Sequence, residues 1–337
     1  MPSALPDPGS LRLYRASTLP VTVVTGFLGS GKTTLIRRLL ADETAADTAV
    51  IVNEFGEVGL DHLLLEHATD DIVLLPSGCL CCRSRSDLVR ALQSLHDKRE
   101  RRELPPYARV VIETSGLADP GPILQTLVAD PIRLSRYRLA SLLAVVDGQL
   151  GRRQIEDFPL VRLQAMLADR VVISKLDVAD PQAAAGTRAA LRELGVQRVE
   201  PVAAGAMLKD QLFASDARVD GEGRGRVGGD TAHNAEFMSI SRRLRGRFRA
   251  QELANGLHVL TSANGEHLLR LKAIANVTHC ETAMVFHAVQ HQFERPRPLG
   301  AGVSIGESAF VAIARRIAGE HIARELNSVI RRALEAP

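Results

Sequence analysis

The strongest chemical signal in the sequence is a glycine-rich segment that directly follows a short β-branched run. It fits the pattern G-x-x-x-x-G-K-[ST] at every position and runs into an expected helix. Its glycines let backbone amides turn inward around phosphate oxygens, and the helix points its positive end at the same anion. Lys32 is expected to reach the β- and γ-phosphates of a nucleotide, and the Thr33 hydroxyl to bind Mg²⁺. The predicted nucleotide-binding residues here are Gly26, Phe27, Leu28, Gly29, Ser30, Gly31, Lys32, Thr33 and Thr34.

A second candidate lies where another buried apolar run ends in a carboxylate and is soon followed by a glycine. The segment 110–116 reads VVIETSG, so Glu113 closes the predicted strand. A carboxylate there can hold Mg²⁺ directly or through water, while the Gly116 amide can meet the γ-phosphate of a triphosphate. That contact exists only before hydrolysis, so it would act as a conformational switch. Glu113 is also the candidate for positioning the attacking water, on the ground of its place alone.

A third segment, SKLD at 174–177, resembles the guanine-reading signature N-K-x-D at the end of a strand. Asp177 can accept hydrogen bonds from the ring N–H and the exocyclic amine of guanine, a donor pair that adenine lacks. The stem of Lys175 can lie along the base. Ser174 replaces the usual Asn, whose amide ties the base site to the phosphate loop, so reduced affinity or reduced guanine preference is expected. The alternative is a helix-capping Asp beside a surface Lys.

Three of the four cysteines fall within four residues: Cys79, Cys81 and Cys82. Thiolates are soft ligands, and three at this spacing suit Zn²⁺ or a similar transition metal. Glu54, in the segment 53–57, is a candidate fourth ligand, as are Glu57, a His or water. A redox pair and a buried apolar cluster remain alternatives. Because the cluster lies between segments expected to approach the nucleotide, metal affinity and nucleotide state are expected to be coupled.

Composition narrows the class of protein. At 337 residues, with 45% hydrophobic residues, the chain suits two globular domains. Its 42 basic and 39 acidic residues give a net charge of +3, too balanced to indicate nucleic acid as a partner. We expect neither a membrane span, because no apolar run reaches roughly 18–20 residues, nor a signal peptide. The clustered cysteines suit a reducing compartment, so a cytoplasmic location is expected.

Strand and helix signals alternate along the first two thirds of the chain, with near-continuous apolar strands. This pattern predicts an α/β fold with a doubly wound, mostly parallel sheet and functional residues at the carboxyl ends of the strands. Helices are expected over 33–40, 87–98 and 182–194. The predicted strands span 21–24, 49–53, 72–75, 109–113, 141–147 and 170–174.

A glycine-rich stretch at 221–230 predicts a linker between two domains. We expect an N-terminal tail over 1–19, a nucleotide-binding domain over 20–214, a linker over 215–235 and a smaller α+β domain over 236–337. The elements expected in the smaller domain are strands at 236–244, 268–277, 282–293 and 310–317, and helices at 250–263 and 318–334.

Together these segments resemble the CobW-type family of GTPases, P-loop proteins that include zinc and cobalt metallochaperones. The resemblance covers about residues 21–180. A departure is that many members carry a His-rich linker, whereas this linker holds only His233. The motifs that carry the resemblance are GFLGSGKTT at 26–34, NEFGEVGLDH at 53–62, GCLCC at 78–82, ETSGLADP at 113–120, VVDG at 145–148 and SKLD at 174–177.

The resemblance implies GTP hydrolysis with Mg²⁺, and Zn²⁺ bound at the C-x-C-C motif for delivery to a client metalloprotein. It also implies a smaller C-terminal domain, in which RLKA at 270–273 resembles an R-x-K-G segment with Ala273 in place of Gly. Two alternatives stay open: a non-catalytic GTP-binding zinc sensor, and a nickel or cobalt insertion GTPase. The oligomeric state also stays open, with a homodimer as one candidate.

Overall fold

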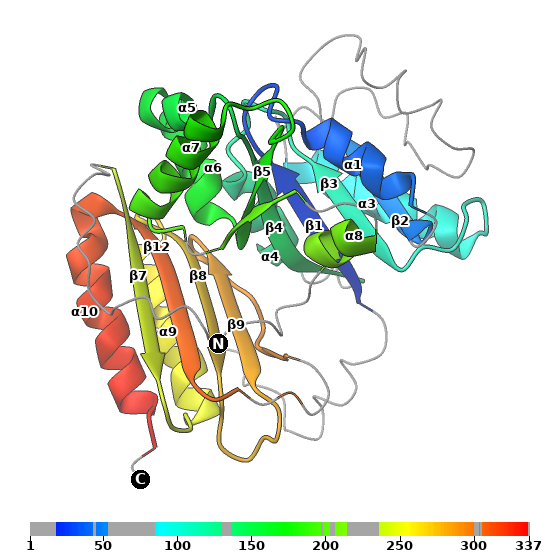
Figure 1. Cartoon of the computed structure of the whole chain (residues 1–337). Helices are drawn as coiled ribbons and strands as arrows, with labels where there is room; N and C mark the ends of the chain where they lie inside the picture. Colours follow the sequence, from blue (N-terminus) through cyan, green and yellow to red (C-terminus); the bar gives the residue numbers. More distant parts are fainter. Residues whose placement is uncertain are drawn as a thin grey trace. The chain divides into compact units, whose positions relative to one another are not determined.

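The chain divides into two compact units, an N-terminal unit at Leu19–Ser215 and a C-terminal unit at Asp216–Pro337. The computed structural model describes residues 18–42, 45–52, 85–129, 136–196, 198–202, 206–213, 236–299, 303 and 305–335. The predicted linker at 215–235 lies outside these residues, as does the predicted tail apart from its last two residues. Each unit has its own six-stranded sheet (Figure 1).

A six-stranded sheet forms the centre of the N-terminal unit, with strand order β2-β3-β1-β4-β5-β6. All its neighbouring strands pair in parallel. The strands are β1 (Leu19–Thr25), β2 (Thr48–Val52), β3 (Arg109–Glu113), β4 (Tyr137–Asp147), β5 (Arg170–Ser174) and β6 (Val199–Pro201). The parallel α/β prediction is confirmed; the strand predicted at 72–75 lies outside the described residues.

Helices cover both faces of this sheet, as the prediction of a doubly wound fold requires. Apolar side chains of α1 and α8 pack on one face, against sheet positions such as Leu143 and Val145. The alternate residues Ala144 and Val146 instead face α6, because successive side chains of a strand point to opposite faces. The helices are α1 (Lys32–Leu40), α3 (Arg85–Glu100), α4 (Gly121–Ala129), α5 (Gly151–Asp157), α6 (Pro159–Leu167), α7 (Pro181–Glu193) and α8 (Ala206–Phe213).

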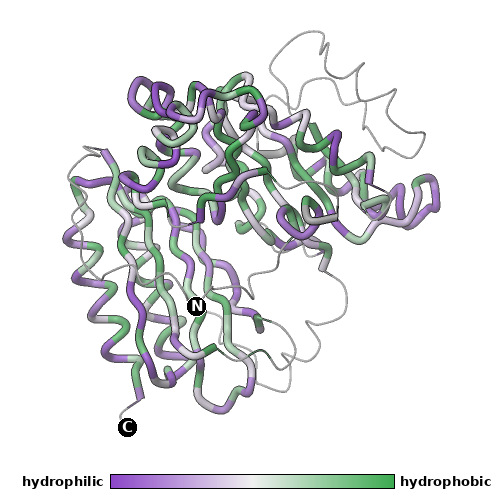
Figure 2. The backbone as a smooth tube through the Cα atoms, in the orientation of Figure 1, coloured by the Kyte–Doolittle hydropathy of each residue, from purple (hydrophilic) through white to green (hydrophobic). Residues whose placement is uncertain are grey.

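The strands of the parallel sheet are apolar along nearly their whole length, which Figure 2 shows as hydrophobic stretches through the middle of this unit. A sheet buried on both faces needs such strands, and their carboxyl ends all open on one edge. The loops after β1, β3, β4 and β5 therefore meet at that edge, and each contains one of the segments singled out above. Among the helices that the structure describes, none has the length and apolar character to cross a bilayer.

The C-terminal unit is an antiparallel sheet of order β10-β9-β8-β12-β7, with β11 paired to β9, and two helices on one face. The α+β prediction is confirmed. The single strand expected over 282–293 is wrong: the chain turns at Gln290, whose φ is 52°, and splits into β9 and β10. The elements are β7 (Phe237–Leu244), α9 (Ala250–Asn264), β8 (Leu268–Ala275), β9 (Met284–Val289), β10 (Gln292–Phe293), β11 (Arg297–Pro298), β12 (Ser308–Arg315) and α10 (Arg316–Ala333).

The C-terminal sheet buries a polar network on the face opposite its helices. Nε of Arg270 donates to Nε2 of His287 at 3.1 Å, so the proton of a neutral imidazole sits on Nδ1, which faces Glu294 Oε2 at 3.3 Å. Burial lowers the pKa of His287, and the nearby cations Arg270 and Lys272 lower it further, against an opposite effect of Glu294. Protonation would also turn Nε2 from an acceptor into a second donor facing Arg270.

We expect this network to make the stability of the protein depend on pH. The unfolded chain takes up a proton at His287 near the ordinary histidine pKa of about 6.5, while the folded unit holds it neutral to lower pH. The contribution of His287 should therefore be complete above about pH 6.5 and decrease as the pH falls below that value. Thermal unfolding of wild type and His287→Gln between pH 5 and 8 measures it. A pH slope that is the same in both proteins would contradict the assignment; the exposed His321→Gln serves as control.

Candidate nucleotide-binding site

The phosphate loop follows β1 and depends on its glycines for its path. Gly26, Gly29 and Gly31 have φ values of 144°, 68° and 94°, a region that other residues rarely adopt. A Cβ on Gly26 would also clash with the carbonyl oxygen of Val145, at the end of β4. The loop therefore lies directly on the carboxyl edge of the sheet, with the first turn of α1 after it.

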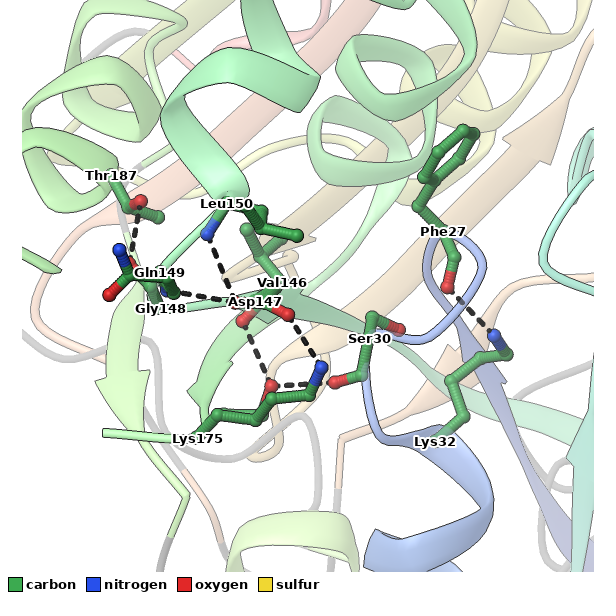
Figure 3. Close-up of polar contacts among 11 residues, drawn as sticks. Phe27, Ser30, Lys32, Val146, Asp147, Gly148, Gln149, Leu150, Lys175 and Thr187 are labelled. Carbon is green, nitrogen blue, oxygen red and sulfur yellow. Dashed lines mark hydrogen bonds and ion pairs between the residues drawn. The ribbon is translucent and has the colours of Figure 1, made fainter. Parts of the chain in front are cut away.

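Lys32 and Thr33 begin α1 and lie at the mouth of this loop. Nζ of Lys32 donates to the carbonyl oxygen of Phe27 at 3.0 Å, across the concave side of the loop (Figure 3). Oγ1 of Thr33 donates to Oε1 of Glu113 at 2.7 Å, although the two residues are 80 positions apart in the sequence. The two predicted magnesium ligands are thus neighbours. Thr34 is exposed on the same turn, and Leu28 is exposed at the tip of the loop.

Gly116, in the turn after β3, packs against the phosphate loop at Leu28. A Cβ at this position would approach the amide nitrogen of Leu28 to 2.7 Å, so no side chain fits there. The β3 strand is tied to β1 just before this turn, since Oγ1 of Thr114 donates to Oγ1 of Thr25 at 3.0 Å. The predicted switch glycine therefore already lies in contact with the backbone that would surround the phosphates.

The tie between the base site and the phosphate loop, which the change from Asn to Ser174 was expected to remove, is present. Oγ of Ser174 donates to the carbonyl oxygen of Ser30 at 2.6 Å and also contacts the carbonyl oxygen of Val146 at 3.3 Å. The hydroxyl can reach because the loop passes close to the end of β5. Asp177 is exposed in the following turn, and the cap of α7 is a different residue, Asp180, which accepts from two backbone amides. The helix-capping alternative for Asp177 is therefore wrong.

Asp147, at the end of β4, organises the loop next to the predicted base site and was given no role from the sequence. Its carboxylate binds Nζ of Lys175 at 2.6 Å and accepts from the amides of Gln149 and Leu150 at 2.8 and 3.0 Å (Figure 3). Burial alone would raise the pKa of Asp147, but these hydrogen bonds outweigh it and hold that pKa below its usual value. The strand-end Asp followed by Gly148 was the available signal.

Exposed apolar side chains gather on the same edge of the sheet. In the described part of the N-terminal unit, each large apolar residue that is exposed lies in a loop near the carboxyl ends of strands or between α5 and α6. Phe158, which precedes α6, also stacks on Phe27 of the phosphate loop with ring centroids 4.7 Å apart. These residues are Leu28, Leu117, Leu150, Phe158 and Val178.

The predicted zinc ligands Cys79, Cys81, Cys82 and Glu54 lie outside the described residues. Within the described ranges, no group of three or more His, Cys, Asp or Glu side chains is placed to hold a metal ion. The remaining cysteine, Cys280, is a half-buried free thiol in the C-terminal unit. The zinc site therefore stays a prediction from the sequence.

A parallel sheet with a glycine loop, a lysine and a Thr–Glu pair at its carboxyl edge defines a P-loop nucleotide-binding protein. Residues 20–199 match the family described as CobW/HypB/UreG, nucleotide-binding domain, and residues 237–330 match the Cobalamin synthesis protein cobW C-terminal domain. The chain belongs to the CobW/HypB/UreG family, as the motifs predicted.

Named relatives are similar over part of their length. The chain is 40% identical over 161 residues to the zinc chaperone YjiA of Escherichia coli, covering 48% of this chain and 50% of that protein. It is 32% identical over 172 residues to the zinc-regulated GTPase metalloprotein activator 1 of Schizosaccharomyces pombe, covering 49% and 41%. The chain thus spans about half the length of the curated relatives it matches, or somewhat less.

The fold resemblance extends further than the sequence matches. The crystal structure of Zn(II)-bound YjiA GTPase from E. coli superposes with a TM-score of 0.63 and 25% identity, over 93% of this chain and 99% of that one. Both units of the present chain therefore have counterparts in one solved structure.

The Asp147–Lys175 pair predicts a test of the base site. Asp147→Asn keeps an oxygen for the amides of Gln149 and Leu150 but loses the charge that holds Lys175. A partly exposed ion pair contributes up to about 1 kcal/mol, so we expect guanine-nucleotide affinity to fall by roughly fivefold. Because the pair lies at the predicted base site, the affinities for GTP and GDP should fall by the same factor in calorimetric titrations.

The matched control for this variant is Glu156→Gln. It removes another carboxylate–cation pair, with Arg152 at 2.9 Å, but on the exposed surface of α5. Its nucleotide affinity should equal that of the wild type. Unchanged affinity in Asp147→Asn, or a loss restricted to GTP, would contradict the proposed place of Lys175.

Proposed function

We propose that this protein is a GTP-hydrolysing metallochaperone that binds zinc through Cys79, Cys81 and Cys82 and transfers it to a client protein. The observation that carries the GTPase part is the contact between Thr33 and Glu113 at the mouth of the phosphate loop. The metal part is supported by the C-x-C-C motif and by relatives named zinc chaperones. A cytoplasmic location belongs to the same proposal, because clustered free thiols need reducing conditions.

The donor set at the phosphate loop fits magnesium. The Thr33 hydroxyl and the Glu113 carboxylate are hard oxygen ligands that lie 2.7 Å apart, and Thr33 can keep donating to Glu113 while its oxygen binds a cation. Bound Mg²⁺ would neutralise charge on the β- and γ-phosphates. When nucleotide binds, Nζ of Lys32 would donate to phosphate oxygens instead of the carbonyl oxygen of Phe27. A charged acceptor would thus replace a neutral one.

The chain's own residues would then position the nucleotide for hydrolysis. The backbone amides of the phosphate loop and Lys32 would hold the phosphates, and the Gly116 amide, next to Leu28, would contact the γ-phosphate. Asp177 would accept from the guanine edge, with the Lys175 stem along the base, and the Ser174–Ser30 bond would link base and phosphate sites. Hydrolysis would remove the group that Gly116 contacts, so the turn after β3 would differ between the GTP and GDP states.

Zinc is the cargo in this scheme. Three thiolates and a fourth ligand such as Glu54 would hold it, and an incomplete thiolate set favours transfer over permanent binding. The client would distinguish the GTP state from the GDP state by binding at the phosphate loop and the turn after β3. The exposed side chains of Leu28 and Leu117 lie on either side of the predicted switch glycine, Gly116. Exposed apolar side chains at this point support a transient protein partner beside the site that would change on hydrolysis.

Lys32→Ala tests whether the protein is a GTPase. We expect steady-state GTP hydrolysis to fall roughly 100-fold or more, because a charged donor to the transferring phosphate is lost. Lys98→Ala, near the end of α3, is the matched control and should leave turnover unchanged. Wild-type protein that binds GTP without turnover would support the zinc-sensor alternative instead. ATP hydrolysed as readily as GTP would contradict the role of Asp177.

Replacing Cys79, Cys81 and Cys82 together by Ser tests the zinc site. Tight zinc binding, measured by titration against a chelating indicator, should be lost while GTP affinity remains measurable. Cys280→Ser removes the fourth cysteine from the other unit and should leave zinc affinity as in the wild type. Retained zinc binding in the triple variant would overturn the assignment. Nickel or cobalt as the metal bound on purification without chelator would favour the insertion-GTPase alternative.

A further inference from the structure

A buried amide on α6 contacts the turn that follows β3. Gln164 is only 1% exposed, and its Nε2 donates to the carbonyl oxygen of Ala118 at 3.0 Å. A longer contact of 3.4 Å joins the same nitrogen to the carbonyl oxygen of Gly116. The two acceptors belong to the residues before and after Leu117. One side-chain amide therefore holds two carbonyl groups of the turn.

The contacts fix which way this amide faces. Two carbonyl oxygens require the nitrogen, because an amide oxygen turned toward them would repel both. The other end of the side chain, Oε1, is then buried with no hydrogen-bond partner among the residues that the structure describes. The cavity that Gln164 lines is mostly apolar, with Gly26, Val161 and Ala165 among its walls and Gln154 as the other polar residue. Packing alone would favour an apolar residue in this space, so the donors account for the amide.

The turn held by Gln164 is the one that meets the phosphate loop. It closes on itself through the amide of Ala118, which donates to the carbonyl oxygen of Ser115 at 3.0 Å. Gly116, within it, lies so close to Leu28 that no side chain could be added. A change in the carbonyl positions of this turn would therefore move the Gly116 amide relative to the phosphates.

The same helix also contacts the phosphate loop itself. Phe158 precedes α6 and stacks on Phe27, and Pro159 begins the helix directly after it. Gln164 on α6 and Phe158 directly before it thus touch the two loops between which the γ-phosphate would lie. Buried residues of α6 such as Val161 and Ala165 lie against β4, which holds the helix to the sheet.

We propose that Gln164 is a positioning residue for the γ-phosphate, acting through the turn at Gly116. It holds the two carbonyls so that the Gly116 amide is oriented before nucleotide binds, and it does not touch the nucleotide. This role deepens the proposed GTPase function and rests on it. GDP lacks the phosphate in question, so GDP binding should not depend on Gln164, whereas GTP binding and turnover should.

Two variants test this role in the full-length protein. Gln164→Met keeps the volume and removes the donors, and Gln164→Leu removes them with a second apolar side chain of similar size. We expect the affinity for a non-hydrolysable GTP analogue to fall roughly tenfold in both, which corresponds to about 1.4 kcal/mol. The affinity for GDP should stay within about twofold, and kcat for GTP should fall with KM for GTP raised.

The matched control is Gln211→Met on α8. Gln211 is also buried and its Nε2 also has two acceptors, Glu200 Oε2 at 3.0 Å and the carbonyl oxygen of Pro201 at 2.8 Å. Its substitution should affect GTP and GDP alike. The ratio of the two affinities therefore separates a role at the γ-phosphate from a general loss of packing, which would lower both.

The outcomes distinguish this role from the proposed function. Equal losses for GTP analogue and GDP in the Gln164 variants, or unchanged GTP affinity and turnover, overturn the positioning role while leaving the GTPase intact. A wild-type protein that binds no guanine nucleotide overturns the proposed function and this role with it. If Gln164→Met does not fold, Gln164→Leu gives the same comparison without donors to the turn.

Discussion

The site depends on the close approach of the phosphate loop to the carboxyl ends of β4 and β5. Gly26 lies against the carbonyl of Val145, and the loop then passes near enough to β5 for Ser174 to donate to Ser30. These contacts are made by backbone atoms of the loop. They therefore fix the path of the loop largely independently of which side chains it carries. The remaining parts of the site are placed relative to this loop.

Three further contacts join the strand ends to the phosphate loop and α1, or to one another. Glu113 reaches α1 through Thr33, and Gly116 packs on the loop backbone. Asp147 holds Lys175, so the β4 and β5 loops are joined at the base end. In the Glu113 and Asp147 contacts a buried carboxylate bonds a side chain from a different segment of the edge, so movement of one segment costs a hydrogen bond in the next. A network of this kind suits a site whose parts must respond to a single phosphate group.

The C-terminal unit shows the same use of buried polar contacts for a different purpose. Arg270, from the segment that resembles R-x-K-G, binds His287 rather than facing solvent. Ala273, which replaces the glycine of that pattern, is 1% exposed and belongs to the core beneath α9 and α10. A Cβ is therefore accommodated at this position by the packing of the sheet, and the departure from the pattern leaves the strand intact.

Much of this architecture could be predicted without coordinates. Apolar runs and glycine signals identified the parallel strands and the phosphate loop, because burial on both faces and the need for positive φ leave clear traces in local sequence. The turn at Gln290 escaped prediction, since neither Gly nor Asn marks it. The predicted zinc ligands lie outside the described residues, so that site is supported by their spacing in the sequence and by the names of relatives rather than by geometry.

The sequence by itself determined the family, the α/β class and which residue types could bind phosphate, magnesium and guanine, because these follow from motifs within short windows. Only the tertiary structure decided which of them meet. Thr33 and Glu113, Ser174 and Ser30, and Gln164 and the turn at Gly116 come from distant positions. These contacts depend on the order of the strands in the sheet and on the angle at which a helix crosses it. Neither feature can be predicted from a short stretch of sequence.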